Sequence, residues 1–247
     1  MRKFVILTTI LIGVGLMFTT CNREDNSPNT IHNAVSDVDG NSYDAVRIGK
    51  QVWMKTNLRT KHFQDGSPII NGDDLIIIGE TIPADPVYSE PVTVEQLANL
   101  PDYNKDAYGL YYNWSAVADS RGLCPKGWHV PSDNEWKDLT KCVYNKYSDE
   151  VTKALASTNG WKESQYGGTP GFVPDKNNAT GFSAIPAAVL WLAGENHAGE
   201  FAFFWTSSEC IELDYCAFSC FINYNEKDVN VEYISKENVA SVRCVRD

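Results

Sequence analysis

Hydrophobic and polar residues alternate in several short stretches of the chain, and this pattern predicts most of the strands. Residues 43–48 and 51–55 alternate on either side of Gly49 and Lys50, which is typical of a β-hairpin. Residues 64–92 are rich in Gly, Pro and Asp and are expected to be mostly loop. After Gly181 the chain alternates again, and we expect strands at 201–206, 215–222, 229–234 and 239–245. In the last strand three small apolar residues should face the core: Ala240, Val242 and Cys244.

The middle of the chain has the period of a helix. Ser132 and Glu135 have the spacing of a capping box, in which each side chain satisfies a free backbone N–H of the first turn. The apolar residues that follow at helical spacing should face the core: Trp136, Leu139, Val143 and Tyr147. We expect a second helix from Ser148, as its N-cap, through Ala156, and a short one at 93–100. Helices in the middle and antiparallel strands at the end predict an α+β fold.

The first residues have the build of an export signal. Arg2 and Lys3 precede residues 4–20, which carry no charge. A retained transmembrane anchor is the alternative, since such a run is at the lower length limit for a spanning helix. The residues before Cys21 resemble the lipobox of bacterial lipoproteins, which implies that Cys21 is acylated and that 1–20 is a signal peptide. The acidic residues just after Cys21 resemble surface-export signals of Bacteroidetes lipoproteins. We expect a flexible tether at 21–36 and one globular domain at 37–247.

The amino-acid composition limits the kinds of molecule that the protein is expected to bind. The formal net charge is −11, and no compact cluster of Lys and Arg offsets it, so nucleic-acid binding is excluded. Aromatic residues make up 12% of the chain, which is enough for a substantial core.

Several blocks of residues resemble, in the same order, the Fibrobacter succinogenes major paralogous domain. They are residues 37–43, 48–54, 57–58, 108–114, 123–132, 135–136, 181–184, 205–209 and 241–247. The resemblance implies a C-type lectin-like fold, shared with formylglycine-generating enzymes, with two helices, a small twisted antiparallel sheet and long loops. It also implies an exported lipoprotein, in a family whose molecular function is largely unassigned. The chain departs from the family at 186–190, where relatives carry Pro-Gly-Gly-x-Arg, and at 71–106, which lacks an aromatic, Asn-rich loop.

Six of the seven cysteines follow Cys21, and in an exported chain an even number suggests disulfides. Cys216 and Cys220 lie on one predicted strand, roughly 13 Å apart, so they cannot pair with each other. The resemblance implies that Cys124 and Cys244 are bonded.

For the other four cysteines two outcomes stay open. Cys210 and Cys216 flank a predicted hairpin turn and could bridge it, which would leave Cys142 with Cys220. The alternative is that several of them are buried thiols. A zinc site is disfavoured, because Cys216 and Cys220 lack the C-x-x-C spacing and no His lies close by in the sequence.

The sequence carries no enzyme signature that we recognise: no Gly-x-Ser-x-Gly, His-Glu-x-x-His, P-loop or dinucleotide-binding motif. The four histidines are far apart, and His129 is expected to hold a turn by hydrogen bonds. Calcium-dependent sugar binding is disfavoured, because residues 205–209, where such lectins carry Trp-Asn-Asp, contain a single carboxylate. We therefore expect no catalysis, no metal and no cofactor.

Aromatic residues in irregular segments are the remaining candidates for a binding site. Trp161, Tyr166 and Phe172 lie in a stretch rich in Gly and Asn, and Trp191 lies in a second irregular segment. Exposed rings there would stack on sugars or anchor a protein, whereas the alternative is that they belong to the core.

We expect a lipid-anchored protein of the outer membrane, displayed at the cell surface, that binds a glycan or a partner protein without catalysis. The alternatives are a structural envelope or fimbria-associated lipoprotein and a hydrolase with an unrecognised site.

Overall fold

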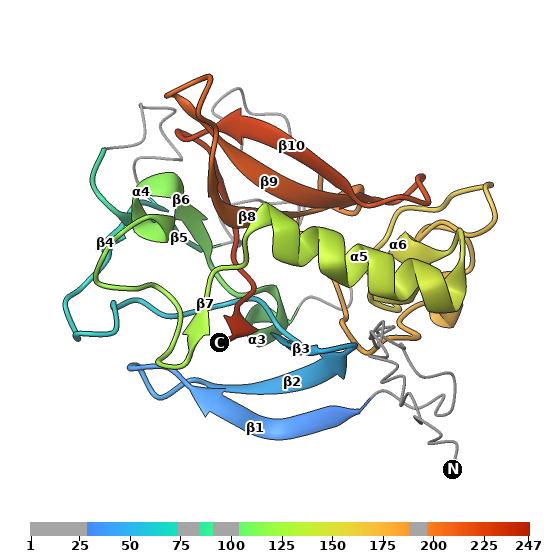
Figure 1. Ribbon diagram of the computed structural model, residues 1–247, viewed down its shortest axis with the longest axis horizontal. Coiled ribbons are helices and arrows are strands. Elements are labelled where there is room, and N and C mark those ends of the chain that lie inside the picture. Colours follow the sequence, from blue (N-terminus) through green and yellow to red (C-terminus); the bar gives the residue numbers. More distant parts are fainter. Residues whose placement is uncertain (1–28, 74–83, 91–103, 188–196) are drawn as a thin grey trace, which may run out of the picture.

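A computed structural model describes residues 29–73, 84–90, 104–187 and 197–247, which form two β-sheets and a few helices (Figure 1). The five-stranded sheet has the order β1 (Thr30–Ser36), β2 (Ser42–Ile48), β3 (Gln51–Met54), β12 (Val245–Arg246) and β7 (Trp128–His129). The seven-stranded sheet has the order β10 (Asn230–Ser235), β9 (Cys216–Asn223), β8 (Phe201–Glu209), β11 (Val239–Ser241), β6 (Tyr111–Asn113), β5 (Val87–Ser89) and β4 (Ile70–Asn71). The helices are α3 (Lys105–Tyr108), α4 (Trp114–Val117), α5 (Asp133–Tyr147), α6 (Val151–Leu155) and the 3₁₀ turn η2 (Pro174–Lys176). The fold is α+β, as predicted, with β-structure predominant.

The predicted hairpin is β2–β3. Ile48 pairs with Gln51, and Gly49 between them has φ +59°. A Cβ on Gly49 would lie 2.8 Å from Sγ of Cys142 on α5. Glycine is therefore required at this turn both by its backbone conformation and by the close approach of the helix.

The predicted long helix is α5, and its capping box is present. Ser132 Oγ accepts from the Glu135 amide at 3.3 Å, and the Glu135 carboxylate accepts from the Ser132 amide at 2.8 Å. The second helix, α6, is shorter than predicted. Ser148 does not cap it, because this residue has φ +54° and its amide donates to Tyr144 O, which ends α5. The helix predicted at 93–100 lies outside the described residues.

The tether predicted at 21–36 is wrong for residues 30–36, which form β1 along the edge of β2. Ile31, Ala34 and Val35 pack against the core although they do not alternate in the sequence. The register shifts between Ile31 and Val35, and Asn33 has φ +47°. This irregularity hides the period of the strand from sequence analysis.

The strand predicted at 239–245 is two strands in different sheets, β11 and β12. Ala240, Val242 and Cys244 face the core as expected, but the residues between them are buried too, including Arg243. The last segment of the chain is therefore enclosed on both faces.

Cys124 and Cys244 form a disulfide, with Cα atoms 6.0 Å apart and a separation of 120 positions in the sequence. This is the pair that the family resemblance implied. Cys142, Cys210, Cys216 and Cys220 are thiols, so the two further bridges considered above are not present.

Candidate functional site

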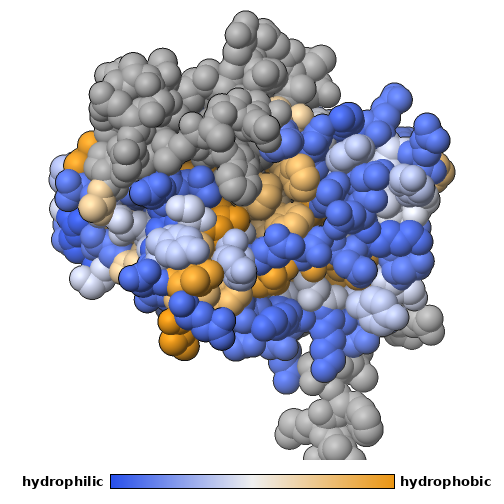
Figure 2. All heavy atoms as spheres, turned by 90° about the horizontal axis from the view of Figure 1, so that it is seen from above, coloured by the Kyte–Doolittle hydropathy of each residue, from blue (hydrophilic) through white to orange (hydrophobic). Residues whose placement is uncertain are grey.

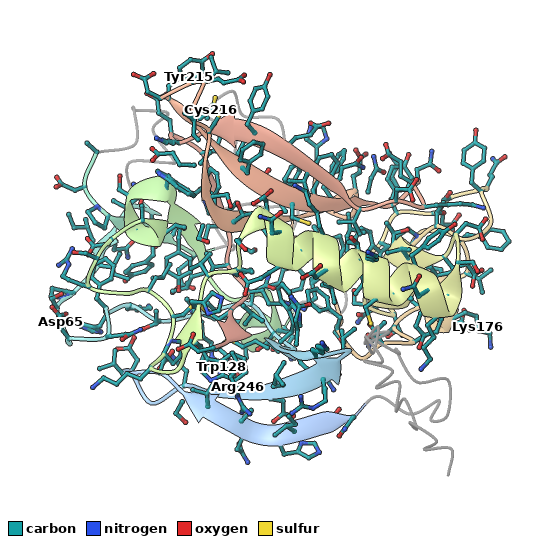
Figure 3. All side chains as sticks on the ribbon, in the orientation of Figure 1. Asp65, Trp128, Lys176, Tyr215, Cys216 and Arg246 are labelled. Carbon is teal, nitrogen blue, oxygen red and sulfur yellow. A yellow bond between two sulfur atoms is a disulfide. The ribbon has the colours of Figure 1, made fainter. Side chains whose placement is uncertain are left out.

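A hollow of about 620 Å³ opens beside the C-terminal end of α5, next to the loop that follows α6. Figure 3 places Lys176, one of its lining residues, at the end of the molecule beyond the last turn of α5. The lining residues are Tyr147, Asp149, Glu150, Lys153, Gly167, Gly168, Phe172, Val173, Lys176 and Lys227. The hollow thus combines aromatic rings with side chains of both charges.

Lys153 of α6 fixes the loop at one side of the hollow. Its buried ammonium donates to the carbonyl oxygens of Phe172 and Val173 and, at 2.9 Å, to Oδ1 of Asn177. Burial lowers the pKa of Lys153, and these three oxygen acceptors replace the water that the ammonium has lost. The same Asn177 donates to the carbonyls of Ser157 and Pro170. The loop is therefore held in place by a buried polar network that includes Lys153 of α6, and not only by contacts within the loop.

Backbone strain lies next to this network. Val173 has φ +53°, a left-handed conformation that is unfavourable for a β-branched residue. Both its own carbonyl and that of Phe172 are fixed by Lys153, which maintains the strained conformation. The Phe172 ring, 39% exposed, is consequently presented at the hollow on a fixed backbone.

The four aromatic residues predicted as ligand-binding candidates differ in their exposure and in their position relative to the hollow. Trp161 is only 7% exposed and donates its Nε1–H to Ser157 Oγ at 3.1 Å, so its prediction as a ligand-binding ring is wrong: it belongs to the core. Tyr166 is 63% exposed on the same loop but does not line the hollow. Phe172 lines it, and Trp191 lies outside the described residues.

Two of the lysines that line the hollow are paired with carboxylates. Lys227 contacts Asp149 at 2.7 Å, which raises the pKa of the lysine and lowers that of the aspartate, and Lys176 lies 3.9 Å from Asp175. The side chains that line the hollow can therefore donate and accept hydrogen bonds, and their positive and negative charges largely cancel. In the part of the chain that the structure describes, no three His, Cys, Asp or Glu side chains gather in a way that could hold a metal ion.

A second hollow, of about 400 Å³, lies between the β2–β3 hairpin and α3. Arg59 borders it, with its guanidinium 4.7 Å from the centre of the Tyr43 ring and 3.8 Å from the Asp106 carboxylate. No exposed aromatic ring lines this hollow, so it is the weaker candidate.

A buried arginine, which the sequence analysis did not single out, joins the blocks of the family resemblance. Arg243 donates to Asn57 Oδ1 from Nε at 3.2 Å and from Nη2 at 2.6 Å, and also to the carbonyls of Phe182 and Ser183. Its guanidinium stacks on the rings of Phe182 and Phe204 at 4.5 and 5.2 Å. Burial lowers the pKa of Arg243 to about 9, so it stays charged at neutral pH. These residues build the core and are not accessible to a ligand.

All four histidines bond carboxylates. His129 lies between two of them, with Nδ1 2.6 Å from Asp247 and Nε2 2.7 Å from Glu135. His62 contacts Asp39, His32 contacts Asp44, and His197 contacts Glu200. His129 holds the start of α5 to the end of the chain, which is the structural role predicted for it.

No helix within the described ranges is long and apolar enough to cross a membrane. Comparison with curated proteins and with solved structures found no match. The family model of the Fibrobacter succinogenes major domain matches residues 46–246. This range includes the seven-stranded sheet, strands β3, β7 and β12 of the five-stranded sheet, α5 and the buried Arg243 network. The chain therefore belongs to the Fibrobacter succinogenes major domain family.

Proposed function

We propose that this protein binds a glycan without catalysis, through the hollow beside the 160–178 loop. The observation that carries the proposal is the exposed Phe172 ring, held at the hollow by the buried Lys153 ammonium beside a strained Val173. Rigid aromatic rings stack on the apolar faces of sugars, and paired charges nearby supply donors and acceptors for hydroxyl groups. Strain that is maintained by a buried network is typical of binding sites.

The proposal includes a location and a finer fold. We propose an outer-membrane lipoprotein, anchored through acylated Cys21 and displayed at the cell surface, with a C-type lectin-like domain. Disulfides persist in oxidising compartments, so the bond between Cys124 and Cys244 supports export from the cytoplasm. The polar residues after Cys21 suit a segment between the lipid and the first strand.

Glycan binding is tested with the soluble 29–247 fragment on a glycan array, provided that a cooperative melting transition shows the fragment to be folded. We expect retention of one class of glycan and about tenfold weaker binding by Phe172→Ala, because a stacking ring contributes about 1 kcal/mol or more. Tyr233→Ala, which removes an exposed ring on β10 away from the hollow, is the matched control and should bind normally.

Three outcomes would contradict the binding proposal. If Phe172→Ala binds the glycan as tightly as the wild type does, this hollow is not the binding site. Absence of any retained glycan, together with co-purification of envelope proteins from outer membranes, would favour a structural lipoprotein. Turnover of chromogenic glycosides or esters would favour a hydrolase.

Lipid anchoring is tested separately by Cys21→Ala in the full chain. Acyl chains give stable anchoring because each buried methylene contributes about 0.8 kcal/mol. We expect the variant to move from the membrane fraction to the soluble fraction after cell breakage and centrifugation. A variant that still sediments with membranes would show that Cys21 is not the anchor.

A further inference from the structure

Cys210 and Cys216 lie where β8 turns into β9, one position beyond the last pair between these strands. The register pairs Glu209 with Ala217, and the next positions outward are Cys210 and Cys216. Facing residues of an antiparallel pair have Cα atoms about 4.5–5.5 Å apart, which is within the range that a disulfide spans. Both residues are buried at the base of the turn.

The surroundings of this pair are fixed by Lys236, which follows β10. Its backbone amide donates to Tyr215 O at 2.9 Å, its ammonium donates to Asp214 O at 2.6 Å, and the ammonium also pairs with Glu209. Burial raises the pKa of Cys216, proximity to Cys210 raises it further, and the Lys236 charge opposes both effects. The effect of Cys210 on the pKa of Cys216 agrees with the short separation expected from the register.

The loop between the two cysteines protrudes from the molecule. Ile211 is 98% exposed, and Figure 3 shows Tyr215 and Cys216 together at the tip of the seven-stranded sheet. Figure 2 looks onto the face of the molecule toward which this tip points, and hydrophobic residues lie among hydrophilic ones on that face. Within the described residues, Ile211 is the most exposed of the large hydrophobic side chains.

We propose that Cys210 and Cys216 are a redox-active pair that a small disulfide oxidant converts to a second disulfide, which fixes the 211–215 loop. The proposal rests on the export proposed above only for the source of the oxidant in the cell. One cysteine thiolate attacks a sulfur of the oxidant, whose S–S bond breaks and releases one thiolate. The other cysteine then attacks the mixed disulfide, closes the intramolecular bond and releases the second thiolate. The two protein thiols lose two electrons and two protons, and the oxidant is reduced to two thiols.

The experiment uses purified protein and oxidised glutathione, so its result does not depend on where the protein resides. We expect a mass about 2 Da lower and a fragment pair joined through Cys210 and Cys216 after cleavage at Glu212 or Asp214. Further cleavage after Phe218 separates Cys216 from Cys220 and identifies the partner. Because a seven-residue loop is closed, the melting temperature should rise by roughly 4–8 °C. Oxidation should be faster at higher pH, since the thiolate is the nucleophile.

Two variants make the test decisive. Cys142→Ala removes the half-buried thiol of α5 and should still close the bridge and gain thermal stability. Cys216→Ala should show neither the joined fragments nor the rise in melting temperature. If Cys210 and Cys216 are both alkylated after oxidant treatment of the folded protein, or if either stays as a mixed disulfide with glutathione, the proposal is wrong. Failure of Cys21→Ala to leave the membrane would instead contradict the lipoprotein proposal and leave this chemistry unaffected.

Discussion

At the scale of single residues, several of the residues that carry the family resemblance are fully buried. Trp53 and Trp136 have ring centres 4.8 Å apart, and the ring of Phe182 packs edge-on against both. Arg243 stacks on the Phe182 ring and donates its hydrogen bonds to Asn57 and to backbone carbonyls; among the described residues it has no carboxylate partner. A family signature built from such residues specifies the fold, which is why it identifies the family but names no ligand.

The Arg243 network leads to the first stability prediction. Arg243→Lys keeps the charge but removes the planar fork that bonds Asn57 twice and stacks on two rings. We expect a loss of about 2–4 kcal/mol in the free energy of unfolding, measured by urea denaturation, because the ammonium is left poorly paired in the core. Arg246→Lys, where an exposed guanidinium stacks on Trp128, is the control and should cost less than about 1 kcal/mol. Equal effects in the two variants would contradict this account.

The aromatic candidates show where prediction from local sequence ends. Trp161 and Phe172 lie in the same loop and each follows a glycine, yet one is buried and the other is exposed. Their contacts differ: Ser157, only four residues away, accepts from the Trp161 ring, whereas Lys153, 19 residues from Phe172, fixes the backbone there. Nothing near Lys153 in the sequence indicates that its ammonium will be buried against a loop some twenty residues later.

At the scale of elements, structure follows sequence where the determining contacts are local. The capping box and the helical period of α5 lie within fifteen residues, and the β2–β3 hairpin needs only a turn at Gly49. β1 was missed because the shift near Asn33 breaks its alternation, and its burial depends on the edge of β2. The strand predicted at 239–245 is divided because β11 pairs within the seven-stranded sheet, whereas β12 pairs within the five-stranded sheet.

The start of α5 gives a prediction of pH dependence. Burial of the ring opposes protonation of His129, but hydrogen bonds to Asp247 and Glu135 outweigh it and raise its pKa above the ordinary value. A raised pKa in the folded state contributes stability that is complete below the unfolded value, about 6.5, and is lost as pH rises through the folded value. The urea midpoint should therefore fall between pH 6 and pH 9, by an amount equivalent to less than about 1 kcal/mol because the ring is partly exposed.

His129→Gln is the variant that isolates this contribution, since glutamine does not titrate. Its urea midpoint should vary less between pH 6 and pH 9 than that of the wild type. His32→Gln, at an exposed site on β1, should keep the wild-type dependence. If His129→Gln has the same pH profile as the wild type, the stabilising contribution of the charged ring is absent.

At the scale of the whole molecule, the last nine residues connect the two sheets. Ser241 of β11 pairs with Phe204 of β8 in the seven-stranded sheet, and Val245 of β12 pairs with Trp53 of β3 in the five-stranded sheet. Between these strands, the carbonyls of Val242 and Cys244 accept from the amides of Leu58 and Met54. This segment therefore joins the two sheets through contacts that are distant in sequence, and such contacts form slowly during folding.

The disulfide between Cys124 and Cys244 closes this arrangement and gives the last prediction. It links the segment before β7 to the connecting segment across 120 residues, and both cysteines are buried. Chain-entropy reasoning allows up to about 4.7 kcal/mol for a loop near this length. Cys244→Ser should lower the melting temperature of the oxidised protein by roughly 10 °C, because it loses that constraint and places an unpaired hydroxyl in the core. Cys142→Ser, which leaves the bridge intact, should lower it much less. Non-reducing mass mapping should find the Cys124–Cys244 fragment in the wild type and in Cys142→Ser only; a wild type without it would mean that the two sheets are joined by packing and hydrogen bonds alone.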